Sequence, residues 1–314
     1  MKHQIPPNKN PMHRLAFISL FFFFSINPPI PALAQAPHDR SFWQAIVKSK
    51  YAVPEHESAD ALAHELSAFL ASPDPELRDD LAYSILGTWI LRKNSPLSGP
   101  TLIELTDEWR ANLKDGLGES GTNSVLKRSF SALCLSAMAE REAKLPFMGG
   151  ERYHQLVKEA AQYLVSEHDL RGYDAQLHWI HATAHTADLL GALADSPMLT
   201  KDESGEILAA VDERLFTAPQ VYTQGEQDRL AAAVVAVIRR ADVDPSTFKA
   251  WLEKIKNEDR DVWSATTLES LARYQNHNYM LEALEARVSL EPDFRADRRL
   301  QTGSPGFGTN AVRA

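Results

Sequence analysis

Cysteine is almost absent from the 314-residue chain, since Cys134 is the only one. A single thiol cannot form an intramolecular disulfide or a zinc site of several cysteines, and its apolar surroundings predict an ordinary buried thiol. An excess of basic residues is also lacking, because 33 Lys and Arg stand against 42 Asp and Glu and the formal net charge is −9. That sign argues against a protein that binds nucleic acid through its phosphates. No GxSxG sequence is present to form the nucleophile elbow of a serine hydrolase.

Long apolar runs are scarce, and the one near the N-terminus, residues 15–26, has only twelve residues. An α-helix of that length spans about 18 Å, well short of the roughly 30 Å hydrocarbon core of a bilayer. Basic residues precede the run and Ala32-Leu33-Ala34 follows it, which is the layout of a secretory signal peptide. We therefore predict a signal peptide over residues 1–34, cleavage after Ala34, and a periplasmic or secreted protein.

Removal of this segment takes away three Lys and Arg and no acidic residue, so the mature chain carries a formal charge of −12. Export and acidity together argue against nucleic acid and against anionic membrane surfaces as partners. The other apolar runs, such as residues 230–238, are too short to cross a bilayer, so we expect no membrane span in the mature chain.

Between residues 39 and 290 apolar side chains recur every three or four positions, and this spacing predicts helix after helix. One such series is Leu77, Leu81, Ile85 and Trp89. Capping groups mark helix starts at Asp74-Pro75, at Asp244-Pro245 and at the pair Thr200 and Glu203. No sustained alternation of apolar and polar residues predicts a strand. The expected fold is all-α, with about eleven helices joined by short connections.

Helix pairs recur about every 45 residues, inside the range of HEAT-like repeats. We therefore predict a helical-repeat protein, a HEAT-like α-solenoid or α-α superhelix, with an irregular single-layer bundle as the alternative. Residues 35–296 are expected to form a single all-helical domain. Residues 297–314 contain glycine, proline and polar residues without periodicity, and they are predicted to be disordered. Five tryptophans are expected to fill the core between helices: Trp43, Trp89, Trp109, Trp251 and Trp263.

The most unusual stretch is residues 174–193, DAQLHWIHATAHTADLLGAL, which is predicted to form one helix. At about 100° per residue, three histidines and one aspartate fall in a single arc of roughly 80°. They are His178, His181, His185 and Asp188. His181 and His185 are four positions apart, which lets two imidazoles on adjacent turns bind one ion. Leucines flank the arc on both sides, so its polar side chains are expected to face the interior.

Burying imidazoles is costly unless they are hydrogen-bonded or metal-bound, and three interpretations remain open. In the first, His181, His185 and Asp188 bind a divalent metal such as zinc, with water at an open position. In the second, Asp188 orients one histidine for acid–base chemistry. In the third, the same side chains form a hydrogen-bonded network that ties neighbouring helices together. The HxxxH spacing lacks the glutamate of HExxH, so spacing alone does not select the metal site.

Three further polar residues are weaker candidates. Asp80 lies in the first turns of an expected helix, where the helix dipole also favours an acid on a solvated face. Glu119 lies in a Gly-rich segment and could add a ligand, although that segment has turn chemistry and no phosphate-binding spacing. Arg128 could pair with such an acid or with a substrate carboxylate, or it could lie on a helix surface.

Three segments resemble a bacterial family known as domain of unknown function 2785: residues 79–90, 119–135 and 171–190. The third segment is similar to the family's pattern of R-G-[WY], a short spacer and G-W-x-H-A-x-A-H-x-A-D-L-L. The residues that fall on this pattern are Arg171, Gly172, Tyr173, Trp179, His181, His185 and Asp188. His178 stands where the family tends to have glycine, and Asn123 stands where an aspartate is usual.

The resemblance covers roughly residues 60–195 and implies an all-helical fold, but it implies no established activity. It favours His181, His185 and Asp188 over His178 as members of a site, and it adds Arg171 as a candidate. We therefore expect an exported, soluble helical-repeat protein that acts as a binding or assembly module for a protein or envelope component. The alternative is a metal-dependent hydrolase in which His181, His185 and Asp188 hold a metal-bound water, completed by Glu119 or Asp80.

Overall fold

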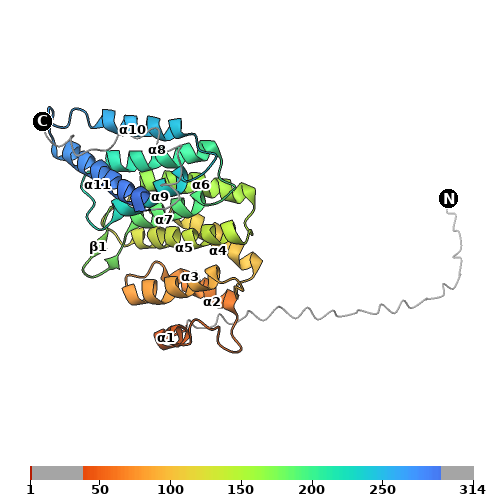
Figure 1. The fold of residues 1–314 in the computed structure, drawn as a ribbon. Helices are drawn as coiled ribbons and strands as arrows, with labels where there is room; N and C mark the ends of the chain where they lie inside the picture. The colour runs from red at the N-terminus through yellow and green to blue at the C-terminus, as the bar shows by residue number, and fades with distance from the viewer. Residues whose placement is uncertain (2–37, 291–314) are drawn as a thin grey trace. The chain divides into compact units, whose positions relative to one another are not determined.

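The computed structural model describes Met1 and residues 38–290. Within these residues the chain forms eleven α-helices, one π-helix and a hairpin of two short strands (Figure 1). This confirms the predicted all-α class with about eleven helices. None of the described helices combines the length and the apolar character that a membrane crossing requires. The rest of the predicted signal peptide and the predicted disordered tail lie outside the described residues.

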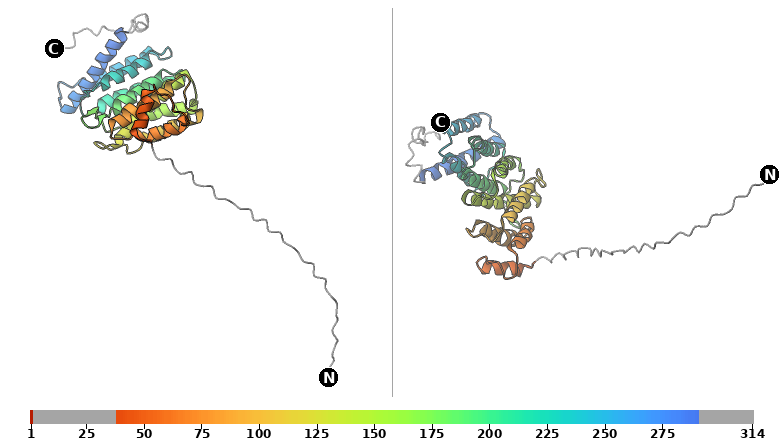
Figure 2. Two further views of the ribbon diagram at one scale, coloured as in Figure 1. Left: turned by 90° about the horizontal axis from the view of Figure 1, so that it is seen from below. Right: turned by 90° about the vertical axis from the view of Figure 1, so that its right-hand side faces the viewer.

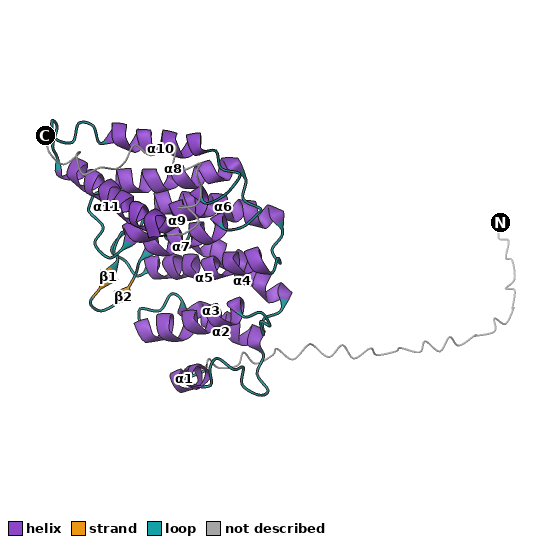
Figure 3. Cartoon of the chain, viewed as in Figure 1, coloured by secondary structure: helices purple, strands orange, loops and turns teal. Residues whose placement is uncertain are grey.

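Helices make up nearly all of the regular structure in the described part of the chain (Figure 3). The elements follow one another as α1 (Arg40–Lys48), α2 (Ala59–Phe69), η1 (Glu76–Tyr83), α3 (Ser84–Leu91), α4 (Gly99–Asn112), α5 (Ser124–Lys144), α6 (Gly150–Ser166), β1 (Tyr173–Asp174), β2 (His178–Trp179), α7 (Ala182–Ala194), α8 (Lys201–Thr217), α9 (Glu226–Ile238), α10 (Pro245–Glu258) and α11 (Leu268–Leu290).

Several helix starts lie where the capping residues predict them. Thr200 and Glu203 form a capping box at the start of α8, in which each side chain binds the backbone of the other residue. At α10 the Asp244 side chain accepts a hydrogen bond from the backbone N of Ser246, and Pro245 takes the first helical position. These contacts satisfy backbone N–H groups that have no partner within the helix.

Asp74-Pro75 also precedes a helix, but the segment that follows, η1, is wound as a π-helix before α3 continues it. Turns of this kind are rare in proteins and often occur at functional sites. Arg78 of η1 is completely buried. Its guanidinium donates hydrogen bonds to Leu177 O at 2.7 Å and to Trp179 O at 3.1 Å. The π-helix therefore holds the β1–β2 hairpin in place.

The helices are arranged largely in sequence order from α1 to α10, as the colours show (Figure 1), and the right-hand view of Figure 2 shows the same order from another side. α5 packs against α7, α7 against α9, and α9 against α11. α6 packs against α8, and α8 against α10. Because α6 contacts α7, and α8 contacts both α9 and α11, these two series lie beside each other as two rows.

Apolar side chains fill the space between the helices. Trp43, Trp89 and Trp109 are completely buried and Trp251 is nearly so, as predicted, and the Cys134 thiol is buried in α5. Trp263 was expected in this core, and that expectation is wrong, because its side chain is 70% exposed. It lies in the turn between α10 and α11 rather than on the apolar face of a helix.

Candidate functional site

The prediction of one helix over residues 174–193 is wrong in its first part. β1 and β2 pair antiparallel, with Asp174 opposite His178, and α7 begins eight residues later than predicted. Asp174 closes the hairpin turn, because its Oδ1 accepts hydrogen bonds from the backbone N of Gln176 and of Leu177, both at 2.8 Å. Such aspartate turns offer the backbone an alternative to the helix. The helical arc therefore does not include His178.

His181 lies at the N-terminal end of α7 with a φ of 51°, in the left-handed region. Its ring stacks on that of Trp179 with the centroids 4.4 Å apart. The Nε2 atom of His181 lies 3.1 Å from Gln224 O and 3.7 Å from Glu226 Oε1. Burial lowers the pKa of His181, and the Glu226 carboxylate opposes this shift. Nε2 therefore carries the ring proton and donates it to the Gln224 carbonyl.

His185 lies one turn further along α7, and its ring stands almost perpendicular to that of His181 with the centroids 5.9 Å apart. Its Nδ1 is 2.8 Å from Ser129 Oγ. The Ser129 hydroxyl donates its own proton to Ile180 O, so His185 Nδ1–H is the donor to Ser129. Burial lowers the pKa of His185 to about 3. His185 is consequently a neutral imidazole near neutral pH.

Asp188 pairs with Arg229 of α9, and Asp188 Oδ2 lies 2.5 Å from Arg229 Nη1. Burial raises the pKa of Asp188, and the hydrogen bond from Arg229 opposes this rise. Each of the three predicted residues thus has a partner within the protein, as in the network interpretation. Metal binding by His181, His185 and Asp188 together stays a prediction.

Three of the other candidates are exposed. The His178 ring stacks on that of Tyr173, with the centroids 5.7 Å apart, at the surface of the hairpin. Asp80 lies on the solvent side of η1, as its position in the first turns suggested. Glu119 accepts hydrogen bonds from the hydroxyl group of Thr122 in its own loop, at 2.8 Å, and from that of Ser124 at the start of α5, at 2.7 Å. The contacts of Glu119 are therefore those of a turn.

The two candidate arginines are tied to acidic residues. Arg128 is completely buried rather than on a helix surface, and it donates to Glu167 through Nε at 2.7 Å and through Nη2 at 3.0 Å. Arg171 donates to Asp169 through Nε at 2.8 Å and through Nη2 at 2.6 Å. Such two-point ion pairs are strong and directional. Both guanidinium groups therefore hold loops of the protein itself.

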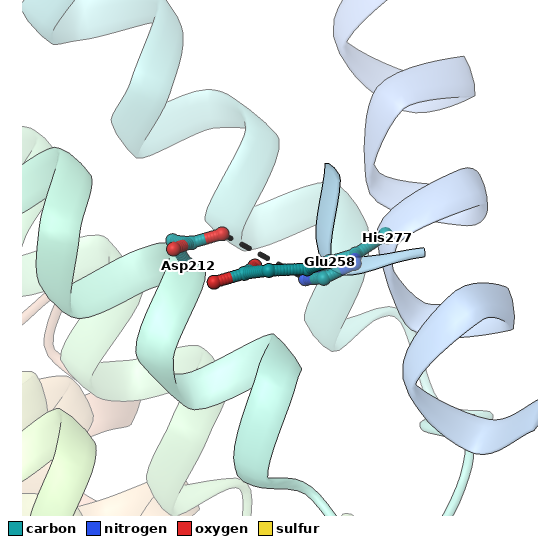
Figure 4. A group of neighbouring side chains, drawn as sticks. All are labelled: Asp212, Glu258 and His277. Carbon is teal, nitrogen blue, oxygen red and sulfur yellow. Dashed lines mark ion pairs between the residues drawn. The ribbon is translucent and has the colours of Figure 1, made fainter. Parts of the chain in front are cut away.

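A different cluster of side chains lies where α8, α10 and α11 meet: Asp212, Glu258 and His277 (Figure 4). Each offers one ligand atom, and these atoms lie within 4.8 Å of one another. Within the described residues, this is the one group of three or more His, Cys, Asp or Glu side chains arranged so that it could hold a metal ion. Within the cluster, His277 Nε2 lies 3.8 Å from Asp212 Oδ1.

Each residue of this cluster has one buried side-chain atom without a hydrogen-bond partner. The side chains of Asp212 and His277 are 0% and 1% exposed. Asp212 Oδ1, Glu258 Oε2 and His277 Nε2 are all shielded from solvent, and none of them makes a hydrogen bond. A buried polar atom left in this condition costs about 1–3 kcal/mol, and charged groups cost more. Three such atoms in one cluster of side chains therefore favour a ligand that binds there.

The imidazole of His277 is oriented by a second carboxylate behind it. His277 Nδ1 donates to Asp259 Oδ2 at 2.8 Å, and Arg273 Nε in turn lies 3.2 Å from Asp259 Oδ1. With the proton on Nδ1, the lone pair of Nε2 faces Asp212. Metal-binding histidines almost always donate their other ring N–H in this way, which fixes the tautomer and the ring orientation.

The Lys254 ammonium supplies the nearby positive charge. Its Nζ contacts Asp212 Oδ2 and lies 2.8 Å from Glu258 Oε1. Burial raises the pKa of Asp212; the hydrogen bond from Lys254 opposes this rise, and the Glu258 carboxylate adds to it. One ammonium thus faces two carboxylates, and the cluster has an excess of negative charge.

One imidazole and two carboxylates are a suitable donor set for a divalent transition-metal ion. Zinc bonds of about 2.0–2.2 Å place neighbouring ligands of a tetrahedral site about 3.4 Å apart. The 3.8 Å between His277 Nε2 and Asp212 Oδ1 is therefore only a few tenths of an ångström too long. The three ligand atoms lie within 4.8 Å of one another, so the side chains must move closer together to bind such an ion.

No local pattern in the sequence points to this cluster. Its three residues come from three helices, at positions 212, 258 and 277, and each looks like an ordinary polar residue of its own helix. The adjacent acids Glu258 and Asp259 at the end of α10 are the nearest to a local signal, and acids near a helix C-terminus oppose the helix dipole.

Comparison with known proteins gives a family and no function. The sequence profile of a family described as "Protein of unknown function (DUF2785)" matches residues 113–285, which is more than half of the chain. The matched range contains Asp212, Glu258 and His277 as well as the predicted histidine site, but not the resembling segment at residues 79–90. No curated protein and no solved structure matches. The chain belongs to the DUF2785 family.

Proposed function

We propose that this protein binds one divalent transition-metal ion, with zinc as the best-fitting ion, between Asp212, Glu258 and His277. Two observations carry the proposal: Asp212, Glu258 and His277 bring ligand atoms within 4.8 Å of one another, and each of the three has a buried side-chain atom without a hydrogen bond. The Asp259 carboxylate supports it, because it holds His277 in the tautomer that a metal requires. Three protein ligands leave a tetrahedral ion one further position for water or another small ligand.

Metal binding here would join three helices. Asp212 comes from α8, Glu258 is the last residue of α10, and His277 lies in α11. An ion that binds the folded chain and not the unfolded chain raises stability by an amount that grows with its concentration. The proposed role therefore has a structural consequence, the fixing of the C-terminal end of α10, besides any chemistry at the open position.

The test is equilibrium dialysis of the chelator-treated protein against zinc, followed by elemental analysis. We expect about one tightly bound zinc ion per chain, because the three ligands form a single site. Asp212→Asn removes a charged ligand with little change of shape. His277→Asn keeps a donor near Asp259 and removes Nε2, so both variants should lose the ion.

His154→Asn is the matched control, because His154 Nδ1 lies 2.8 Å from Glu203 Oε1 in an ion pair without a third ligand. It should bind zinc like the unmodified protein. Absence of stoichiometric zinc from the unmodified protein, or equal binding by all variants, would contradict the proposal.

A second candidate function is the binding or assembly module, and an open hollow favours it. The hollow has a volume of about 520 Å³ and lies over α5, α7 and α9, with Ala187, Gly191 and Ala232 among its lining residues. We infer that the two rows of helices form a HEAT-like α-solenoid and that this hollow belongs to its concave surface, the usual binding face of such proteins. Ala232→Arg would place a long side chain in it, and loss of a protein or envelope partner in cross-linking experiments on cells would support this role.

We place these activities outside the cytoplasm, because residues 1–34 have the layout of a cleaved signal peptide. N-terminal sequencing of the protein from the producing cells tests this: a start at Gln35 is expected, and an intact N-terminus would contradict export.

A further inference from the structure

The ammonium group of Lys254 already binds the two carboxylates of the cluster. It contacts Asp212 Oδ2 and lies 2.8 Å from Glu258 Oε1. The second oxygen of each carboxylate, Asp212 Oδ1 and Glu258 Oε2, is buried and has no hydrogen bond. Lys254 thus pairs with one oxygen of each carboxylate and leaves the other oxygen of each without a partner.

We propose that Lys254 is the resident counter-ion of this site and that a divalent metal ion displaces it, so that Lys254 sets the affinity of the site. This proposal rests on the proposed metal site. A metal ion bound to both carboxylates would lie within a few ångströms of the ammonium, with like charges facing each other. The ion and the ammonium therefore compete for the same two carboxylates.

The three groups differ in their freedom to move. The Lys254 side chain is 52% exposed, whereas that of Asp212 is completely buried. A flexible four-carbon stem lets the ammonium turn into water, where it is well solvated. Asp212 has no such escape, and His277 is held by Asp259. Lys254 is consequently the group that leaves when a metal ion binds.

The exchange has a consequence for the surface of α10. Without metal, Lys254 bridges α10 to α8 and also pairs with Glu258 one turn away on its own helix. With metal, the ion takes over the link between α8 and α10, and the amine of Lys254 becomes free. The Lys254 ammonium on the surface of α10 is then mobile and no longer paired, so its exposure to solvent depends on whether a metal ion is bound.

The first experiment compares zinc affinity in Lys254→Met and in Lys256→Met by competition with a chromophoric chelator. Lys256 lies on the same helix, but its Nζ pairs with Glu253 at 3.2 Å and the side chain is 73% exposed. Removal of the competing ammonium should tighten zinc binding about tenfold, the size expected for loss of one partly solvated ion pair. Lys256→Met should change the affinity less than about twofold.

The outcomes separate the two proposals. Tighter binding by Lys254→Met alone supports the exchange. Zinc binding by the unmodified protein with equal or weaker binding by Lys254→Met overturns the exchange and leaves the metal site standing. Absence of zinc binding from both the unmodified protein and Lys254→Met overturns the metal site itself, and the exchange with it.

The second experiment needs no substitution. The unmodified protein is labelled briefly with an amine-reactive reagent, with and without zinc, and the two lysines are quantified by mass spectrometry. Labelling of Lys254 should rise severalfold on zinc addition while that of Lys256 stays constant. Equal labelling of Lys254 in both conditions, at a zinc concentration where the ion is bound, would contradict the displacement.

Discussion

His185 is buried as an uncharged imidazole, and this makes the stability of the fold sensitive to acid. The pKa of this imidazole falls from its ordinary value of 6.5 to about 3, chiefly because the ring is buried. Below about pH 6.5 the unfolded chain binds a proton at this position, whereas the folded chain does not until the pH approaches about 3. The free energy of unfolding therefore decreases as the pH falls through this window.

The size of the effect follows from the shift in pKa. One pKa unit corresponds to about 1.4 kcal/mol. Protonation of His185 in the unfolded chain therefore lowers the free energy of unfolding by about 2 kcal/mol at about pH 5 relative to about pH 8. His185→Asn removes the titrating ring and keeps a short amide that can donate to Ser129 as Nδ1 does. The variant is expected to be less stable overall, since a buried ring is lost, but also less sensitive to acid.

Urea unfolding of the unmodified protein and of His185→Asn at about pH 8 and about pH 5 gives the required comparison. We expect the unmodified protein to lose about 2 kcal/mol more than the variant between these two conditions. His168→Asn is the control, since His168 is exposed, and it should behave like the unmodified protein. Equal losses in the unmodified protein and in His185→Asn would refute the assignment of His185 as a buried neutral imidazole.

Three further predictions concern stability. Zinc at a hundred times its dissociation constant should stabilise the unmodified protein by about 2.7 kcal/mol and leave Asp212→Asn unchanged, as thermal unfolding with and without zinc would show. Arg128→Met should destabilise the fold by about 3–5 kcal/mol in urea unfolding, because it leaves the buried Glu167 carboxylate without its partner. Arg229→Met should lower the free energy of unfolding by no more than about 1 kcal/mol, because Arg229 is half exposed and water can take its place beside Asp188. A larger decrease in urea unfolding would contradict the description of Asp188–Arg229 as a solvated ion pair.

Local sequence signals predicted the helices well because their causes are local. The capping box of Thr200 and Glu203 and the start of α10 after Asp244 depend on side chains within one turn of the backbone groups that they bind. Apolar spacing of three and four residues likewise reports the face that each helix buries. The all-α class and the helix number follow from such signals alone.

The β1–β2 hairpin was missed because its causes are not all local. Arg78 holds the segment through the carbonyl of Leu177, a residue 99 positions further along the chain. Asp174 was a local signal for a turn, but the histidine spacing in the same segment also matched a helix. Tertiary contacts decide between two such local alternatives, and a single sequence does not reveal them.

The cluster of Asp212, Glu258 and His277 was missed for the same physical reason. Asp212, Glu258 and His277 become neighbours only through the packing of α8, α10 and α11, and no spacing relates their positions in the sequence. His181, His185 and Asp188 drew attention because they lie close together in the sequence. In the structure each of those side chains has a partner within the protein, as the Asp188–Arg229 pair illustrates.

Anomalous diffraction at the zinc absorption edge, from crystals of the full protein equilibrated with zinc, tests the central claim most directly. The account predicts one strong peak between α8, α10 and α11, about 2.0–2.2 Å from His277 Nε2 and from one carboxylate oxygen each of Asp212 and Glu258. A strong peak at His181, His185 and Asp188 instead, or no peak at the three-helix cluster, would contradict it.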